Sequence, residues 1–143
     1  MKRNIWFVFI LLSSFILSAS APTSAETPPP PHAASQEALL ALQQASSKPL
    51  QVEWDNAGNL PSFIMASIPT ETSDPETAAR QFFVRYGGLY AMRDQAQELA
   101  LSRIDTDELG MQHVRFNQAV NGVPVFGAQM IVHQRGNEIT AVN

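Results

Sequence analysis

The sequence predicts an α+β domain in which one main helix packs on an antiparallel β-meander sheet. A helical pattern of apolar residues runs through ETSDPETAARQFFVRYGGLYAM, residues 71–92. Four strand-like runs follow it, and strands joined by short connections pair as antiparallel neighbours. The chain has no cysteine, so such a domain depends on its apolar core rather than on disulfides.

The first segment, residues 1–25, has the pattern of a secretory signal peptide with an uncertain cleavage position. Lys2 and Arg3 precede the apolar run IWFVFILLSSFIL, and the small residues of SASAPTSA follow it. The alternative is a membrane anchor, but the apolar run is shorter than the roughly 20 residues of a spanning helix. No cysteine follows the run, which excludes lipid attachment there. We therefore expect a secreted protein with no membrane contact after signal cleavage.

Residues 26–47 are expected to form a Pro-rich linker and a short amphipathic helix. Four consecutive prolines favour an extended polyproline II spacer, although they could also bind an aromatic groove. In SQEALLALQQASS, Ser35 is a candidate N-cap, and Leu39, Leu40 and Leu42 lie on one helical stripe.

Residues 48–143 are expected to form the α+β domain. LQVEW and LPSFIMASIP read as two strands around the turn DNAGN. In the main helix, Asp74 precedes Pro75, a favoured first helical residue, and Ser73-x-x-Glu76 is a possible capping box. Gly87-Gly88 is a stop signal. The helix face that should cover the sheet carries Ala79, Phe82, Phe83 and Tyr86.

The last four strands are expected in ELALSRI, MQHVRFNQAV, VPVFGAQMIVH and EITAV, separated by DTDELG, NG and RGN. Asn121-Gly122 offers the positive φ angles of a tight turn, and Pro124 suits the start of a strand. Gly127 inside the strand indicates a bulge or a close backbone approach.

The strand after Gly127 is apolar on both faces. Ala128, Met130 and Val132 point to one side and Ile131 to the other. Two interpretations follow: a central strand under two layers, which the sequence favours, or a strand whose second face meets a partner.

Charge excludes some partners. Without Lys2 and Arg3, 7 basic residues remain against 13 acidic ones, a net charge of −6. An acidic surface without basic clusters argues against nucleic acid and anionic membranes as partners.

The histidines offer little for a metal. His32 lies in the linker, whereas His113 and His133 lie on neighbouring strands. If Val120 pairs with Val125 across a four-residue loop, the two histidines point to opposite faces; a loop one residue longer or shorter brings them together. In neither case is a third ligand evident, and two imidazoles make a poor zinc site.

Other chemistry is equally hard to place. The sequence has no His-Glu-x-x-His, no serine in a glycine-flanked elbow and no glycine-rich phosphate cradle. Asp105, Asp107 and Glu108 precede Gly110 in a segment too short for a calcium loop, so they are expected to be turn formers. We expect this chain, as it stands, to be no enzyme and to hold no cofactor.

The C-terminal part of the sequence resembles a known family. DELGMQHVRFNQAVNGVPVFGAQMIVHQRGNEITAVN is similar to the first, N-terminal propeptide domain of thermolysin-family secreted zinc metallopeptidases, the fungalysin/thermolysin propeptide domain. The similarity extends over roughly residues 48–143 and includes the helical segment DPETAARQFFVRYGGLYAM. Asn117-Gln118-Ala119 departs from the Gln-Gln-aromatic sequence that is more typical.

The resemblance implies a function. A precursor of this family continues into a second propeptide domain and a catalytic domain with His-Glu-x-x-His, so zinc and calcium are expected only there. The pro-region is implied to be an intramolecular chaperone and inhibitor of that catalytic domain, its partner in cis or in trans. Two alternatives stay open, a stand-alone secreted binding or inhibitory module and the remnant of a truncated gene. The residues expected at the partner interface, if they do more than hold the fold, are Asn121, Gly122, Val123, Pro124, Phe126, Gly127 and Ile131.

Overall fold

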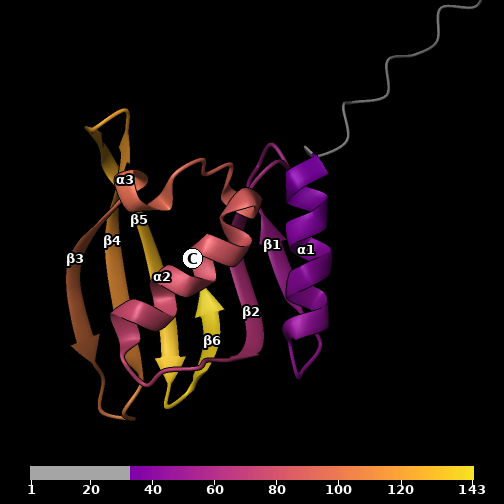
Figure 1. Ribbon diagram of the computed structural model, residues 1–143, viewed down its shortest axis with the longest axis vertical. Coiled ribbons are helices and arrows are strands. Elements are labelled where there is room, and N and C mark those ends of the chain that lie inside the picture. Colours follow the sequence, from indigo (N-terminus) through magenta and orange to yellow (C-terminus); the bar gives the residue numbers. More distant parts are fainter. Residues whose placement is uncertain (1–32) are drawn as a thin grey trace, which may run out of the picture.

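The computed structural model describes residues 33–143, so the predicted signal peptide and the prolines of the linker lie outside the described residues. Six antiparallel strands form one sheet in the order β1-β2-β6-β5-β4-β3, with helices on one side (Figure 1). The α+β class is confirmed. The helical elements are α1 (Ala33–Ala45), α2 (Pro75–Tyr86), the 3₁₀ helix η1 (Gly87–Tyr90) and α3 (Gln95–Glu98). The strands are β1 (Gln51–Trp54), β2 (Pro61–Pro69), β3 (Leu99–Thr106), β4 (Gln112–Val120), β5 (Val123–Arg135) and β6 (Glu138–Val142).

The predicted meander is present as β3 to β6, and all six strands fall where the sequence pattern placed them. The hairpin of β1 and β2 joins this meander because β2 pairs with β6. The last strand of the chain therefore lies inside the sheet, between the first hairpin and the rest of the meander.

Helix α2 begins as its sequence predicts. Asp74 is the N-cap, and its carboxylate accepts a hydrogen bond from the Thr77 amide at 2.8 Å. The capping box is wrong, because Glu76 pairs with Arg80 at 2.8 Å instead of returning to the cap. The predicted helix face is confirmed as core, with Ala79, Phe82, Phe83 and Tyr86 all buried.

Helix α2 ends at Tyr86, directly before Gly87-Gly88, so the predicted stop is confirmed. Gly87 keeps a right-handed φ of −60°, and the chain continues through η1. The left-handed residue is Ala91, with a φ of 55°. The 3₁₀ turn that follows the stop places Leu89 in the core, where it is fully buried.

Helix α1 packs on the domain rather than standing apart from it. Leu42 is fully buried in the common core, whereas Leu40 is 59% exposed. Ser35 is not the N-cap, because the helix begins at Ala33 and the Ser35 hydroxyl donates to the Gly88 carbonyl at 2.9 Å. That bond ties α1 to η1.

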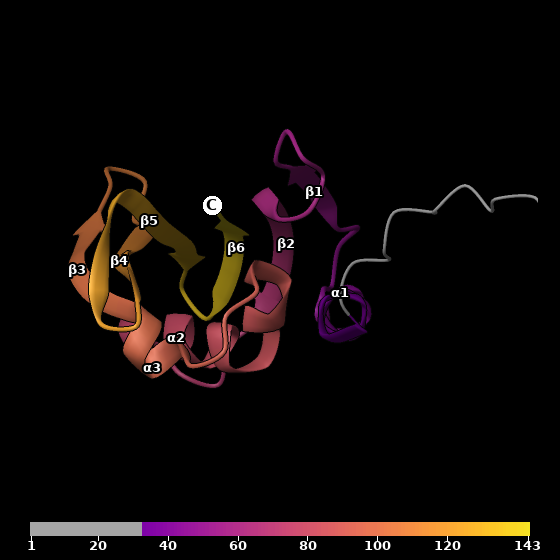
Figure 2. The same cartoon turned by 90° about the horizontal axis from the view of Figure 1, so that it is seen from above.

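The two faces of the sheet have different surroundings. Helices α2 and α3 lie on one side of the curved sheet, and no helix of residues 33–143 covers the other side (Figure 2). We call this second side the open face. One cross-strand row of it runs through all six strands as Gln51, Met65, Ala141, His133, His113 and Asp105.

Strand β5 lies in the interior of the sheet, yet only one of its faces is covered. Met130, Val132 and Gln134 are buried under the helices, whereas Ile131 is half-buried on the open face. The interpretation of β5 as a central strand covered by two layers is therefore wrong for the described residues.

Candidate partner interface

The β4–β5 hairpin ends in a two-residue turn. Val120 pairs with Val123, so the pairing of Val120 with Val125 expected from the sequence is wrong. Asn121 has a φ of 52° and Gly122 a φ of 78°, which confirms the predicted tight turn.

A large bulge follows the turn on β5. Asn117 pairs with Gln129 and Ala119 with Pro124, so residues 125–128 stand opposite Gln118 alone and β5 carries three extra residues. The predicted bulge at Gly127 is confirmed, and this glycine has a φ of 74°. Two side chains of this bulge, Val125 and Phe126, are exposed.

The end of the hairpin exposes apolar side chains. Val120 is 59% exposed and Val123 66% exposed, while Phe126 is fully exposed, with a relative accessibility of 105%. No residue from 116 to 132 carries a charge. The hairpin rises beyond the rest of the sheet (Figure 1). We call Val120, Val123, Val125 and Phe126 the apolar tip; such a surface is typical of an interaction site.

Six of the seven residues expected at an interface lie together at this end of the hairpin. They are Asn121, Gly122, Val123, Pro124, Phe126 and Gly127. Ile131 lies apart on the open face, opposite Arg115, and its amide donates to the Asn143 carbonyl at 2.6 Å. Sequence reasoning missed Val120 and Val125, although apolar residues on both sides of Asn-Gly were a usable signal.

The open face carries a shallow apolar pocket of about 280 Å³. Met65 is 47% exposed at this pocket. The lining residues are Phe63, Met65, Met111, His133, Thr140 and Ala141.

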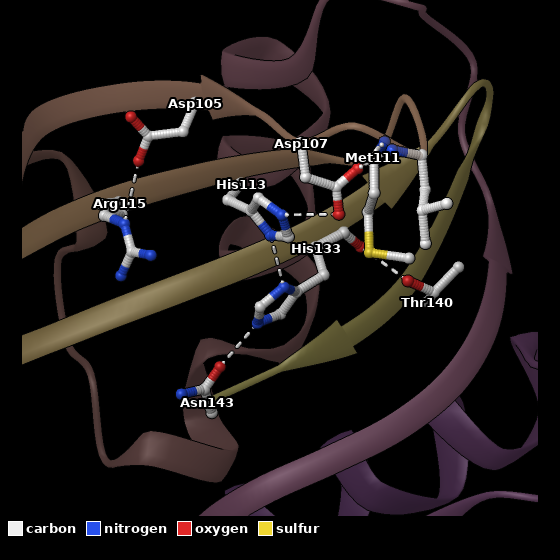
Figure 3. A network of polar contacts seen from close by, with 9 residues as sticks. Asp105, Asp107, Met111, His113, Arg115, His133, Thr140 and Asn143 are labelled. Carbon is white, nitrogen blue, oxygen red and sulfur yellow. Dashed lines mark hydrogen bonds and ion pairs between the residues drawn. The ribbon is translucent and has the colours of Figure 1, made fainter.

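Beside this pocket, four polar side chains form a chain of contacts from the β3–β4 turn across β4 and β5 to the residue that follows β6 (Figure 3). The Nδ1 atoms of His113 and His133 lie 2.7 Å apart. His113 Nε2 lies 3.3 Å from Asp107 Oδ2, and His133 Nε2 lies 2.7 Å from Asn143 Oδ1. The expectation that the histidines point to opposite faces is wrong, because the three extra residues of the bulge shift the register of β5.

Asp107 also shapes the turn between β3 and β4. Its carboxylate accepts from the amides of Met111 and Leu109, each at 2.9 Å. The Met111 backbone hydrogen bond is the main cause that lowers the pKa of Asp107; the Leu109 amide and His113 act in the same direction. The expected turn-forming role is confirmed for this residue.

Asp105 holds two arginines on the open face. Its carboxylate lies 2.9 Å from Arg103 and 3.1 Å from Arg115. Among residues 33–143, no three His, Cys, Asp or Glu side chains are grouped to hold a metal ion. In the same part of the chain, no helix is long and apolar enough to cross a membrane.

Comparison with known proteins places the C-terminal part of the sequence in a family. Residues 97–143 match the Fungalysin/Thermolysin Propeptide Motif. The chain is 30% identical over 100 residues to a thermolysin of Alicyclobacillus acidocaldarius subsp. acidocaldarius, covering 69% of this chain and 18% of the relative. It is 31% identical over 101 residues to the thermostable neutral protease NprT of Geobacillus stearothermophilus, with the same coverage. A bacillolysin of Bacillus subtilis (strain 168) is 35% identical over 79 residues, covering 54% of this chain and 15% of the relative.

The chain spans about a fifth of the length of these curated relatives. No solved structure matches it significantly. The matched segment holds β3 to β6 with their turns, including the apolar tip and both histidines of the open face. This segment is a propeptide region, which is not itself catalytic. It is a propeptide domain of the thermolysin family, and the resemblance seen in the sequence is confirmed.

Proposed function

We propose that the chain is the N-terminal pro-region of a secreted thermolysin-like zinc metalloendopeptidase precursor. In this role it is an intramolecular chaperone and inhibitor of the catalytic domain, in cis or in trans. The observation that carries the proposal is the propeptide motif over β3 to β6. The relatives named thermolysin, neutral protease and bacillolysin support it.

The chaperone and the inhibitor action both follow if the pro-region binds the native-like state of the catalytic domain. A pro-region that binds the native-like catalytic domain lowers the free energy of that state relative to the unfolded chain. Occupation of the enzyme surface keeps the protease inactive, and later proteolysis of the pro-region makes activation irreversible. Zinc and calcium belong to the catalytic domain in this scheme.

The apolar tip is the proposed contact with the catalytic domain. Phe126 is fully exposed and so adds little to the domain's own core, which favours a role in binding over a role in folding. Asn121, Gly122 and Gly127 hold the backbone that presents it, and Val123 and Pro124 flank it. Ile131 provides a second contact on the open face.

The proposed organisation keeps the three segments, with a signal peptide at 1–25, a linker and helix at 26–47 and the propeptide domain at 48–143. Export of the chain follows from the signal peptide. Because Leu42 packs into the core, we expect the helix of the second segment to fold together with the propeptide domain.

The first test is to sequence the source DNA beyond codon 143. An open frame that reaches a His-Glu-x-x-His motif supports the pro-region role. A stop codon directly after Asn143 contradicts the role in cis and favours a separate secreted inhibitory module.

The second test uses the mature protease that such a frame encodes. The chain added in trans should inhibit it, and Phe126→Ser should weaken inhibition at least tenfold, because a buried aromatic anchor contributes about 2 kcal/mol or more to binding. Leu109→Ser is the matched control, since Leu109 is 77% exposed in the β3–β4 turn. Equal effects of the two substitutions would remove the apolar tip from the interface.

A further inference from the structure

The contact between His113 and His133 has room for one hydrogen. At 2.7 Å, one Nδ1 donates a hydrogen bond and the other accepts it. The rings meet edge to face, with centroids 4.9 Å apart. If both Nδ1 atoms carried hydrogen, two N–H groups would point at each other.

The outer nitrogens determine how many protons the pair can hold. His113 Nε2 faces the ionised Asp107 carboxylate, which only accepts, so this nitrogen carries hydrogen. His133 Nε2 donates to Asn143 Oδ1, which leaves His133 Nδ1 as the acceptor. His113 then carries both of its hydrogens and the only positive charge of the pair.

A neutral pair fits the same geometry with one change. His133 then donates from Nδ1 to His113, and its bare Nε2 accepts from the Asn143 amide nitrogen after that side chain turns over. Both states keep every contact. The doubly protonated pair is the one state that cannot.

The charges around the pair compensate one proton and not two. Asp105 stands opposite His113 across β3 and β4, but Arg103 and Arg115 already pair with it. Among the charged side chains of residues 33–143, only Asp107 contacts a ring of the pair. The Met111 amide keeps the pKa of Asp107 below the usual range, so this carboxylate stays ionised where histidines titrate. The side chains that neighbour His133 on β6, directly after β6 and on β2 are uncharged: those of Thr140, Ala141, Asn143 and Met65.

We propose that His113 and His133 form an acid-sensitive latch that ties β4, β5 and the end of β6 together on the open face. The latch holds up to one proton and is broken by a second. In an unfolded chain each histidine gains its own proton between about pH 7 and pH 5. The folded state therefore binds fewer protons in acid, and its stability falls as the pH falls through this range. The inference does not depend on the proposed function.

Nitrogen-detected NMR of the imidazole rings tests the latch directly. The exported chain carries His32→Gln, so that only the two rings of the open face contribute. As the folded chain is titrated from pH 8 to pH 5, we expect one ring to become doubly protonated while the other stays neutral. Two doubly protonated rings in a chain whose β4–β5 amide signals are unchanged would overturn the proposal.

Urea unfolding at pH 7.5 and pH 5.0 measures the consequence. If the folded state binds one proton fewer than the unfolded chain at pH 5.0, the folding equilibrium constant falls by up to about 30-fold between the two pH values. His133→Gln keeps a polar partner for His113 but removes the competition for a second proton, so it should lose most of this pH dependence. His113→Gln should do the same. Equal pH dependence in the parent and both variants would overturn the latch, whatever the stability of the variants at pH 7.5.

Discussion

Strand β5 and its hairpin belong to two regions of opposite character. Under α2, Met130 and Val132 lie in the core with Phe116 of β4, and all three are buried. A few residues away, Phe126 is fully exposed at the apolar tip. The same apolar residue types therefore stabilise the domain in one place and are exposed in the other. The bulge at Gly127 separates the two regions, because it takes residues 125–128 out of the ladder.

The largest effect is expected when a phenylalanine of each region is replaced by alanine and the two losses of stability are compared. Phe116→Ala should destabilise the domain by about 3–5 kcal/mol, the usual cost of a cavity left by a buried phenylalanine. The ring of Phe116 contacts Phe83 edge to face at 5.9 Å, and the Arg80 guanidinium lies 5.1 Å from its centre. Phe126→Ala should change the free energy of unfolding by no more than about 0.5 kcal/mol. Urea unfolding of both variants measures the difference; similar losses would mean that the tip belongs to the core.

The next largest effect on stability is expected at Gly127 in the bulge of β5. Gly127→Val should cost about 1–2 kcal/mol, because a side chain at a φ of 74° is strained although no atom lies within 4 Å of the added Cβ. Gly127→Asn is the control, since asparagine tolerates left-handed backbone, and it should cost less. Thermal unfolding compares the two. Equal stability of the valine and glycine proteins would show that the bulge adopts another conformation.

The N-cap of α2 predicts a smaller effect, visible in acid. Hydrogen bonds from Thr77 lower the pKa of Asp74, so its contribution is present above the unfolded value and is lost as pH falls through the lower folded value. Asp74→Asn keeps the acceptor but cannot titrate. Thermal unfolding between pH 5 and about pH 2.5 should therefore show a steeper loss in the parent than in Asp74→Asn. Parallel curves would contradict the capping role of the charge.

The smallest effect is expected at Tyr90, on the covered side of the sheet. Its hydroxyl is buried with no hydrogen-bond partner among residues 33–143, and burial raises the pKa of Tyr90. Tyr90→Phe should be neutral or stabilising by up to about 1 kcal/mol, since it removes an unsatisfied polar group. The raised pKa also means that stability falls as pH rises above about 10, where the unfolded tyrosine ionises. Urea unfolding at pH 7 and pH 10.5 tests both points; a loss at pH 7 would indicate a partner for the hydroxyl.

Local patterns in the sequence predicted most of the elements. Asp74-Pro75 with the stripe from Ala79 to Tyr86 defined α2, and Asn121-Gly122 with Gly127 predicted the turn and the bulge. These signals act within a few residues, through backbone conformation and the period of apolar side chains. The predicted N-cap at Ser35 failed because a distant contact decided the role of this side chain: its hydroxyl binds the Gly88 carbonyl.

By itself, then, the sequence determined the α+β class, the strands of the meander, the tight turn of the hairpin and the family of its C-terminal part. Only the tertiary structure decided the pairing of β2 with β6, the size of the bulge and the contact of His113 with His133. The physical reason is register. Side chains alternate across a sheet, so an odd number of extra residues in a bulge moves every later residue to the other face. The length of that bulge depends on how the whole strand fits its neighbours.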